Sequence, residues 1–186
     1  MNLIVALAMM AAQPVVSQQQ DAPPQAEEAV DWDKEFGAEK RVPDPVTGEL
    51  PVAPYTPSGA NAGTEPFKGD AMARAFGGQD GIRSIVARLV ELSNTDPRIE
   101  AIFQNHDMVR LRRTLFEQIC FILNAGCNYT GRDMKASHKG MGIARADMNA
   151  LVENLQRAMR EQGVPFAAQN RLLAKLAPMD RHIQER

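Results

Sequence analysis

The side chains most able to do metal or redox chemistry are three histidines and two cysteines in a chain of 186 residues. His106, His138 and His182 lie far apart, so their spacing predicts no multi-histidine metal site. Cys120 and Cys127 are too few for a disulfide scaffold or a four-cysteine zinc site. Any chemistry at a histidine therefore depends on which elements surround it.

The elements expected after residue 70 are all helical, because apolar residues recur there at helical spacing and no segment alternates like a strand. Three long helices are expected around residues 80–94, 108–123 and 148–159, and Pro165 opens a fourth that runs to Ile183. A helical turn near Phe103 and a short segment, 134–139, complete the set. The fold class is all-α, and His138 sits on the short segment between two glycine-bearing loops.

Composition divides the chain near residue 70. Nine of the twelve prolines lie in residues 1–70, which carry a net charge of −7, whereas residues 71–186 carry +5. Proline fixes its own backbone and removes a donor, so an irregular, acidic, Pro-rich arm over residues 18–70 is expected before the helical domain. Trp32, Phe36 and Tyr55 are the residues by which the arm would dock on the domain or a partner; the alternative is a loosely ordered leader.

The first residues resemble a targeting signal. Leu3 to Ala12 is an apolar run of ten, too short to span a bilayer, and Val15-Val16-Ser17 offers small residues for cleavage before Gln18. A signal peptide over residues 1–17 predicts a periplasmic or secreted protein. The run has no basic residues before it, so an uncleaved apolar tail on a cytoplasmic protein is the alternative. A total net charge of −2 gives no reason to expect nucleic-acid binding.

A block of residues carries a family resemblance. Tyr129-Thr130-Gly131-Arg132-Asp133-Met134-Lys135, followed by His138 and Gly140-Met141-Gly142-Ile143, resembles the group 1 truncated haemoglobins in both composition and spacing. Phe76-Gly77-Gly78, Asp96-Pro97-Arg98 and Gly163-Val164-Pro165 extend the resemblance over about 72–183. The resemblance implies a two-over-two helical sandwich, a shortened globin, that encloses haem b.

The resemblance also implies residue roles. His138 stands where the family has its proximal iron ligand, and one imidazole is sufficient because the porphyrin supplies four ligands. Its second ring nitrogen should donate to a backbone carbonyl. The residues expected to contact the haem are Phe103, Leu111, Leu115, Met134, Ile143, Met148, Val152 and Leu155. Those expected near its propionates are Arg110, Arg113, Tyr129 and Lys135.

The distal side departs from the family pattern. Many members hold bound oxygen with a tyrosine whose position corresponds, in a gapless alignment, to Val90, with the neighbours Leu89 and Glu91 as the alternatives. They often also have a polar residue at positions that correspond to Leu111, Thr114 and Leu115. An apolar distal pocket is therefore expected. A charge-assisted donor would stabilise bound dioxygen by about 1.5–3 kcal/mol, so its loss should speed oxygen release by about tenfold or more.

The predicted function is reversible binding of a diatomic gas, oxygen, CO or NO, with discrimination against oxygen. The alternative is NO dioxygenation or peroxidase-like turnover with a separate reductase, because no nicotinamide or flavin fingerprint such as GxGxxG is present. Cys120 and Cys127 would, in an oxidising compartment, link the second long helix to the loop before His138; two buried thiols are the alternative.

Overall fold

The computed structural model describes residues 41–104 and 106–185. The predicted signal peptide, Trp32 and Phe36 lie outside these residues. Within them the regular structure is entirely helical, as the apolar periodicity predicts. No helix in this part of the chain has the length and hydropathy needed to cross a bilayer.

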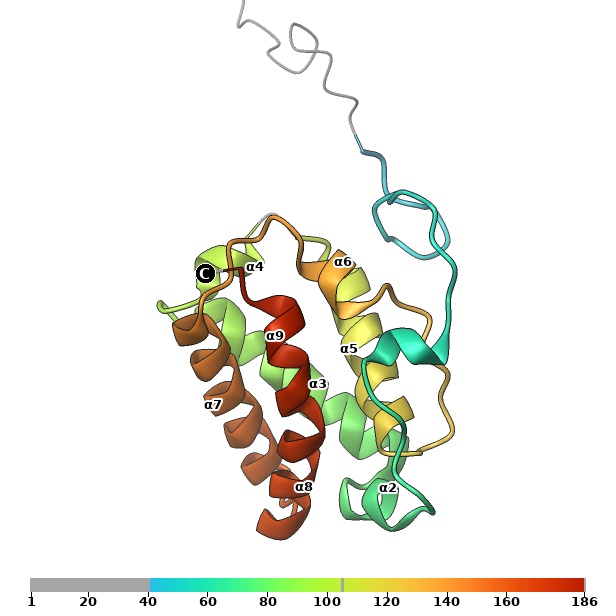
Figure 1. The fold of residues 1–186 in the computed structure, drawn as a ribbon, viewed down its shortest axis with the longest axis vertical. Coiled ribbons are helices and arrows are strands. Elements are labelled where there is room, and N and C mark those ends of the chain that lie inside the picture. The colour runs from blue at the N-terminus through green and yellow to red at the C-terminus, as the bar shows by residue number, and fades with distance from the viewer. Residues whose placement is uncertain (1–40, 105, 186) are drawn as a thin grey trace, which may run out of the picture. The chain divides into compact units, whose positions relative to one another are not determined.

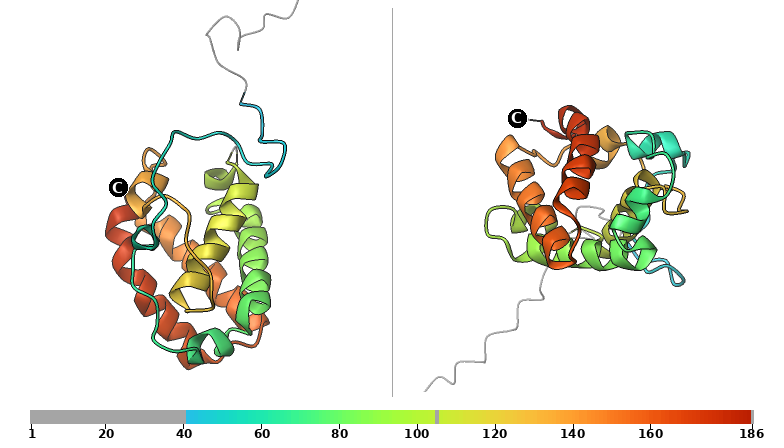
Figure 2. Two further views of the ribbon diagram at one scale, coloured as in Figure 1. Left: turned by 90° about the vertical axis from the view of Figure 1, so that its right-hand side faces the viewer. Right: turned by 90° about the horizontal axis from the view of Figure 1, so that it is seen from below.

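Two pairs of helices build the domain (Figure 1). One pair is α3 (Gly78–Thr95) and α5 (Met108–Ile122), and the other is α7 (Arg145–Glu161) and α8 (Phe166–Leu176). The helix α3 packs against both α5 and α7, so it joins the pairs. Two further views show the pairs as two layers (Figure 2).

Short helices connect and complete the pairs. They are η1 (Gly59–Ala62), α2 (Ala71–Ala75), α4 (Glu100–Phe103), α6 (Met134–His138), η2 (Ala177–Met179) and α9 (Asp180–Ile183). The helix α6 packs against α9, so the segment that bears His138 rests on the C-terminal part of the chain. The expected fourth helix is present from Phe166 to Ile183, but Pro178 gives it a 3-10 turn, η2, between α8 and α9, where the backbone stays right-handed helical. Proline lacks the N–H that a continuous helix would need there.

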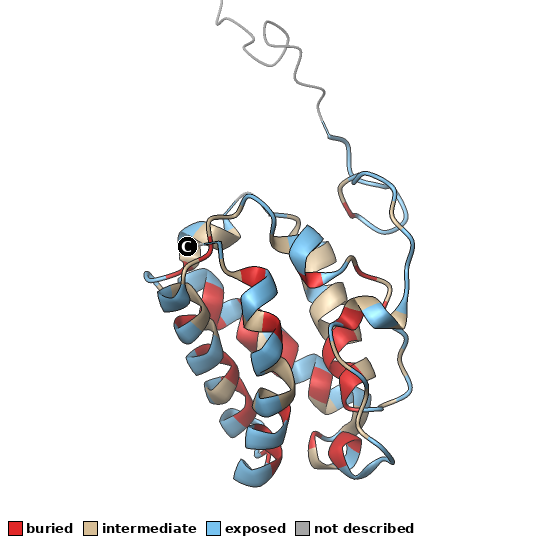
Figure 3. Cartoon of the chain, in the orientation of Figure 1, coloured by how far each residue is buried: buried red, intermediate tan, exposed pale blue. Residues whose placement is uncertain are grey.

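The core runs along the facing sides of these helices (Figure 3). Ile82, Ile85, Val90, Ile122 and Leu172 are almost completely buried and belong to one hydrophobic cluster. Each such side chain stabilises the fold by about 1.5–3 kcal/mol relative to an exposed one. These apolar positions are those from which the sequence predicted amphipathic helices.

The compact unit extends beyond the expected boundary at residue 70. The compact unit begins at Arg41, and residues 41–70 lie on it as an irregular strap that includes η1. The teal segment in Figure 1 is this strap. Its Phe67 packs against the core cluster and donates its backbone N–H to the carbonyl of Ile122 at 2.8 Å. Residues 41–70 contain one 3-10 helix and otherwise irregular backbone, and proline content gives no information on where such a backbone packs.

Glu49 is the charged anchor of the strap. Its buried carboxylate accepts hydrogen bonds from Arg113 and lies 3.1 Å from the guanidinium of Arg110. The hydrogen bonds from Arg113 hold the pKa of Glu49 below its ordinary value, against the opposing effect of burial. The strap is thus tied to α5 by a carboxylate that stays ionised at neutral pH.

We expect Glu49→Gln to lower the free energy of unfolding at pH 7 by about 1–2 kcal/mol, at the low end for charged hydrogen bonds because Arg113 is one-third exposed. A carboxylate with a lowered folded-state pKa contributes stability that is present above its unfolded-state pKa, near 4.5, and is lost as the pH falls through the folded-state value. Urea unfolding at pH 7 and pH 3 measures this. A difference between wild type and variant that does not shrink in acid would contradict the assignment.

Candidate functional site

The short helix α6 carries the most chemically distinctive side chain, His138. Asp133 caps the helix, because its side chain accepts from the backbone N–H of Ala136 at 2.9 Å and its carbonyl accepts from Ser137. Gly140, with a φ of 79°, follows the helix and allows the chain to turn away. A five-residue helix places His138 at its last position.

The imidazole of His138 is held by its own helix. Nδ1 lies 2.7 Å from the carbonyl oxygen of Met134, and a carbonyl only accepts, so Nδ1 carries the proton and donates. The second nitrogen, Nε2, is therefore unprotonated in the neutral ring and offers its lone pair. Burial lowers the pKa of His138, although the hydrogen bond to Met134 and the charge of Glu185 oppose this shift. The ring is thus neutral at pH 7, as a metal-ligating imidazole must be.

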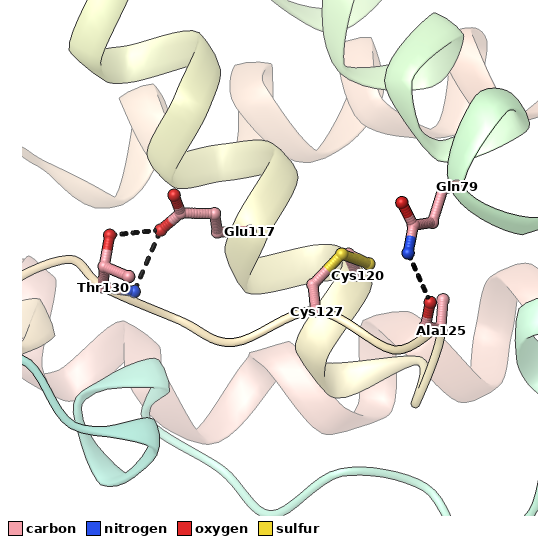
Figure 4. The surroundings of a disulfide bond; sticks show 6 residues. All are labelled: Gln79, Glu117, Cys120, Ala125, Cys127 and Thr130. Carbon is pink, nitrogen blue, oxygen red and sulfur yellow. Dashed lines mark hydrogen bonds between the residues drawn. A yellow bond between two sulfur atoms is a disulfide. The ribbon is translucent and has the colours of Figure 1, made fainter.

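The loop ahead of α6 is fixed to α5 by two tethers (Figure 4). Cys120 and Cys127 are joined in a disulfide. Three residues further on, Thr130 donates through its backbone N–H and its hydroxyl to Glu117, at 2.9 and 2.7 Å. The beginning of the segment that carries His138 therefore has little freedom relative to α5.

The residues expected to contact a haem lie on α4, α5, α6 and α7 and on the loop before α7. Met134, Ile143 and Leu155 are buried, and Leu111, Leu115 and Met148 pack on the core cluster from half-buried positions. Phe103, the last residue of α4, is half-buried. Val152 on α7 is 37% exposed, and its contact with the haem stays a prediction.

The residues expected on the distal side offer no hydrogen-bond donor. Val90 is buried on α3, and Leu111 and Leu115 are one turn apart on α5. The hydroxyl of Thr114 donates to the carbonyl of Arg110 at 2.9 Å, so it is bonded back to its own helix. The side chains at all four positions are therefore apolar or already engaged.

Three of the four residues expected near propionates have other partners. Arg113 binds Glu49, Glu117 and Thr130, and Arg110 contacts Glu49 and Asp107 and donates to the carbonyl of Leu50 at 2.6 Å. The hydroxyl of Tyr129 donates to the carbonyl of Arg132 at 2.8 Å. The role of these three residues at the propionates stays a prediction, and no local pattern shows that Glu49 reaches the two arginines from 61 and 64 residues away. Lys135 is exposed on α6, and its role stays a prediction.

Tyr129 braces the loop instead. Gly131 passes so close beneath it that a Cβ at this position would lie 2.2 Å from the phenol oxygen, so only glycine fits. Glu185 holds the other side of α6, because its carboxylate accepts from the backbone N–H groups of Gly140 and Gly142 at 2.6 and 2.7 Å. The sequence analysis missed Glu185, since nothing in its local pattern shows that the chain end returns to this loop.

Burial raises the pKa of Tyr129 to about 12. We expect an absorbance titration at 295 nm to show one phenol that ionises only near pH 12, and Tyr129→Phe to remove that transition while Tyr55→Phe leaves it. A phenol with a raised folded-state pKa contributes stability that is fully present below its unfolded-state pKa, near 10, and is lost as the pH rises through 12. A complete phenol titration below pH 11 in the folded protein would contradict the buried position.

The helical domain that carries His138 matches a known protein family. A family model described as bacterial-like globin matches residues 72–185, which is more than half of the chain. The chain belongs to the bacterial-like globin family. The match begins after the strap and includes His138, the disulfide and the four long helices.

Curated relatives of this globin are group 1 truncated haemoglobins. The protein of Tetrahymena pyriformis is 27% identical over 95 residues, 51% of this chain and 78% of that protein. The protein of Nostoc commune is 30% identical over 89 residues, 48% of this chain and 75% of that protein.

Solved structures show the same fold. The truncated haemoglobin of Tetrahymena pyriformis in its Fe(III) form matches this globin with a TM-score of 0.59 at 23% identity, over 62% of this chain and 98% of that one. A variant of the group II truncated haemoglobin of Bacillus anthracis matches with a TM-score of 0.57 at 20% identity, over 64% and 93% of the two chains.

Haem is the cofactor that family membership implies for this globin, and haem b is the usual form. The structure contains a side chain with the donor chemistry that haem iron needs. His138 offers an unprotonated Nε2 because Nδ1 is held by Met134, and the ring is kept neutral by burial. The two other histidines, His106 and His182, are both exposed. The donor chemistry therefore singles out one histidine.

Proposed function

We propose that this globin binds haem b through Nε2 of His138 and reversibly binds a diatomic gas, with weak retention of oxygen relative to CO and NO. Haem-based gas binding in general is the property of the family. The observation that carries the more specific proposal is the hydrogen bond from Nδ1 of His138 to Met134, because it fixes which nitrogen faces away from the helix. When bound, the haem supplies an iron that coordinates small diatomic ligands.

The chain's own residues orient the imidazole of His138, and the residues expected on the distal side are apolar. The carbonyl of Met134 fixes the imidazole tautomer and ring orientation, and makes the imidazole a better electron donor. Val90, Leu111 and Leu115, at the positions that correspond to the family's distal side, are apolar and would give dioxygen no hydrogen bond. CO and NO depend less on such a bond. The absence of a donor therefore weakens the binding of oxygen more than the binding of CO or NO.

Stopped-flow measurement of oxygen dissociation from the ferrous protein tests this proposal. A missing donor worth about 1.5–3 kcal/mol corresponds to release faster by about ten- to a hundredfold than from a globin with a donor at these positions. Slow oxygen release would contradict the proposed apolar pocket. NO dioxygenation, the alternative function from the sequence, stays a prediction that NO consumption in the presence of oxygen and a reductant would test.

The proposal extends to the location of the protein. The apolar run at residues 3–12 and the Cys120–Cys127 disulfide both suit an exported protein, because structural disulfides persist in oxidising compartments. We expect the periplasmic fraction of an expressing bacterium to contain a chain that begins at Gln18 and is two hydrogens lighter than the dithiol form. An intact mass that includes Met1 with two thiols, in the cytoplasmic fraction alone, would contradict export.

A further inference from the structure

The strap lies directly against the residues that precede the helix of His138. Three consecutive residues of the loop, 130–132, each bind the strap. The hydroxyl of Tyr55 donates to the carbonyl of Thr130 at 2.9 Å, and Asn61 donates through Nδ2 to the carbonyl of Gly131 at 3.2 Å. Asp133, the N-cap of α6, is the next residue.

In a third contact the loop residue, Arg132, is the donor and the strap supplies the acceptor. Its guanidinium donates to the carbonyl of Ala53 at 2.5 Å and lies 5.2 Å from the centre of the Tyr55 ring. A guanidinium at this distance from an aromatic face is attracted to it. Tyr55 thus contacts the loop through both its hydroxyl and its ring.

The strap is anchored to α5 as well as to the loop. The backbone N–H of Leu50 donates to Asp107 at 2.7 Å, and Glu49 binds Arg113, which itself donates to the hydroxyl of Thr130 at 2.6 Å. One end of the strap therefore holds α5 and the other holds the residues before α6. Both ends lie ahead of residue 72, where the match to the family model begins.

The position of α6 depends on such flanking contacts. A helix of five residues is too short to be stable by itself, since isolated helices below about 12–15 residues are marginal in water. The imidazole of His138 is hydrogen-bonded within the helix, so the ring moves with it. A contact that holds residues 130–132 in place consequently holds the imidazole in place.

We propose that residues 49–61 form a brace on the proximal side of this globin, and that Tyr55 in the brace and Arg132 in the loop it contacts are positioning residues for His138. The functional part of this inference rests on the proposed ligation of haem by His138. The brace sets the direction of the imidazole relative to α5 without contact with the ring itself.

Tyr55→Phe is the sharpest probe, because it removes one hydroxyl and keeps the ring beside Arg132. In the haem-free full chain we expect amide exchange at Ala136 and Ser137, whose N–H groups bond to Asp133, to rise by about fivefold, the change that corresponds to one lost hydrogen bond. Exchange in α3 and α7 should stay unchanged. Asn61→Ala should raise exchange at the same amides, and Val52→Ala, an exposed position of the same strap, is the control without effect.

The haem-loaded ferrous protein gives the second readout, the iron–histidine stretching frequency by resonance Raman. A shift in Tyr55→Phe and Arg132→Ala, with wild-type frequency in Val52→Ala, would support a positioning role that packing alone would not produce. Unchanged exchange at Ala136 and Ser137, or an equal rise throughout the chain, would overturn the brace. Absence of an iron–histidine band in the wild type would overturn the proposed function instead, and the haem-free exchange would still decide the brace.

Discussion

Replacing His138 by glycine is expected to lower haem affinity by at least about 100-fold, because loss of groups that only support a metal ligand already costs 10- to 100-fold. The variant removes the one imidazole whose Nε2 lone pair is presented by a hydrogen bond at Nδ1. Haem transfer to apomyoglobin measures the change. The glycine leaves space in which imidazole added to the solution can bind the iron in place of the His138 side chain.

Two controls separate ligation from folding. His106→Ala and His182→Ala remove exposed imidazoles and should leave haem affinity unchanged. Imidazole in solution should restore the spectrum of His138→Gly but should have no effect on a misfolded chain. A His138→Gly protein with wild-type affinity for haem, or loss of haem in the His106 variant, would show that another side chain binds the iron.

Introducing a donor at Leu115 is expected to slow oxygen dissociation by about tenfold or more, since a hydrogen bond to a partly charged ligand is worth about 1.5–3 kcal/mol. Leu115→Gln lengthens the side chain by one heavy atom and adds an amide on the face of α5 shared with Leu111. CO dissociation should change little, because CO gains less from a donor. Stopped-flow exchange of oxygen for CO measures both rates.

Leu115→Met is the matched control, because it preserves size without a donor and should leave the oxygen rate unchanged. Equal slowing by methionine and glutamine would mean that altered packing controls release. An unchanged rate in Leu115→Gln would mean that position 115 does not face the ligand, and the correspondence of Val90, Leu111 and Leu115 with the family's distal positions would be wrong.

The long helices could be predicted from sequence because each buries a stripe of apolar side chains that repeats locally. Ile82, Ile85 and Val86 on α3 form such a stripe, and all three are buried. The 3-10 turn after α8 was missed because Pro178 lies within apolar positions that keep helical spacing. This turn follows from Pro178 and not from the apolar pattern.

The strap shows what local patterns leave out. Glu49 and Arg113 are 64 residues apart, and Tyr55 and Thr130 are 75 apart, so their pairing depends on how the whole chain folds. Residues 41–70 are mostly irregular, as their proline content indicates. Composition does not identify the residues of the domain that they contact. Because of the same distance, the sequence did not show that Glu49 binds Arg110 and Arg113.

The site itself was predictable in part. The glycine-flanked block made His138 the candidate iron ligand because several residue types recur together at family spacing. The identity of the carbonyl that fixes its tautomer was not predictable, although Met134 lies one helical turn before it. The C-terminal contact of Glu185 with Gly140 and Gly142 likewise required the fold.

The absorption spectrum of the ferrous protein, recorded without and with CO, tests the central claim most directly. Ligation by His138 alone, opposite an apolar pocket, predicts a five-coordinate ferrous spectrum that converts fully to a six-coordinate one when CO is added. A six-coordinate spectrum before CO would contradict the account, because a side chain would already occupy the distal position. Absence of a haem spectrum after reconstitution would contradict it more fundamentally.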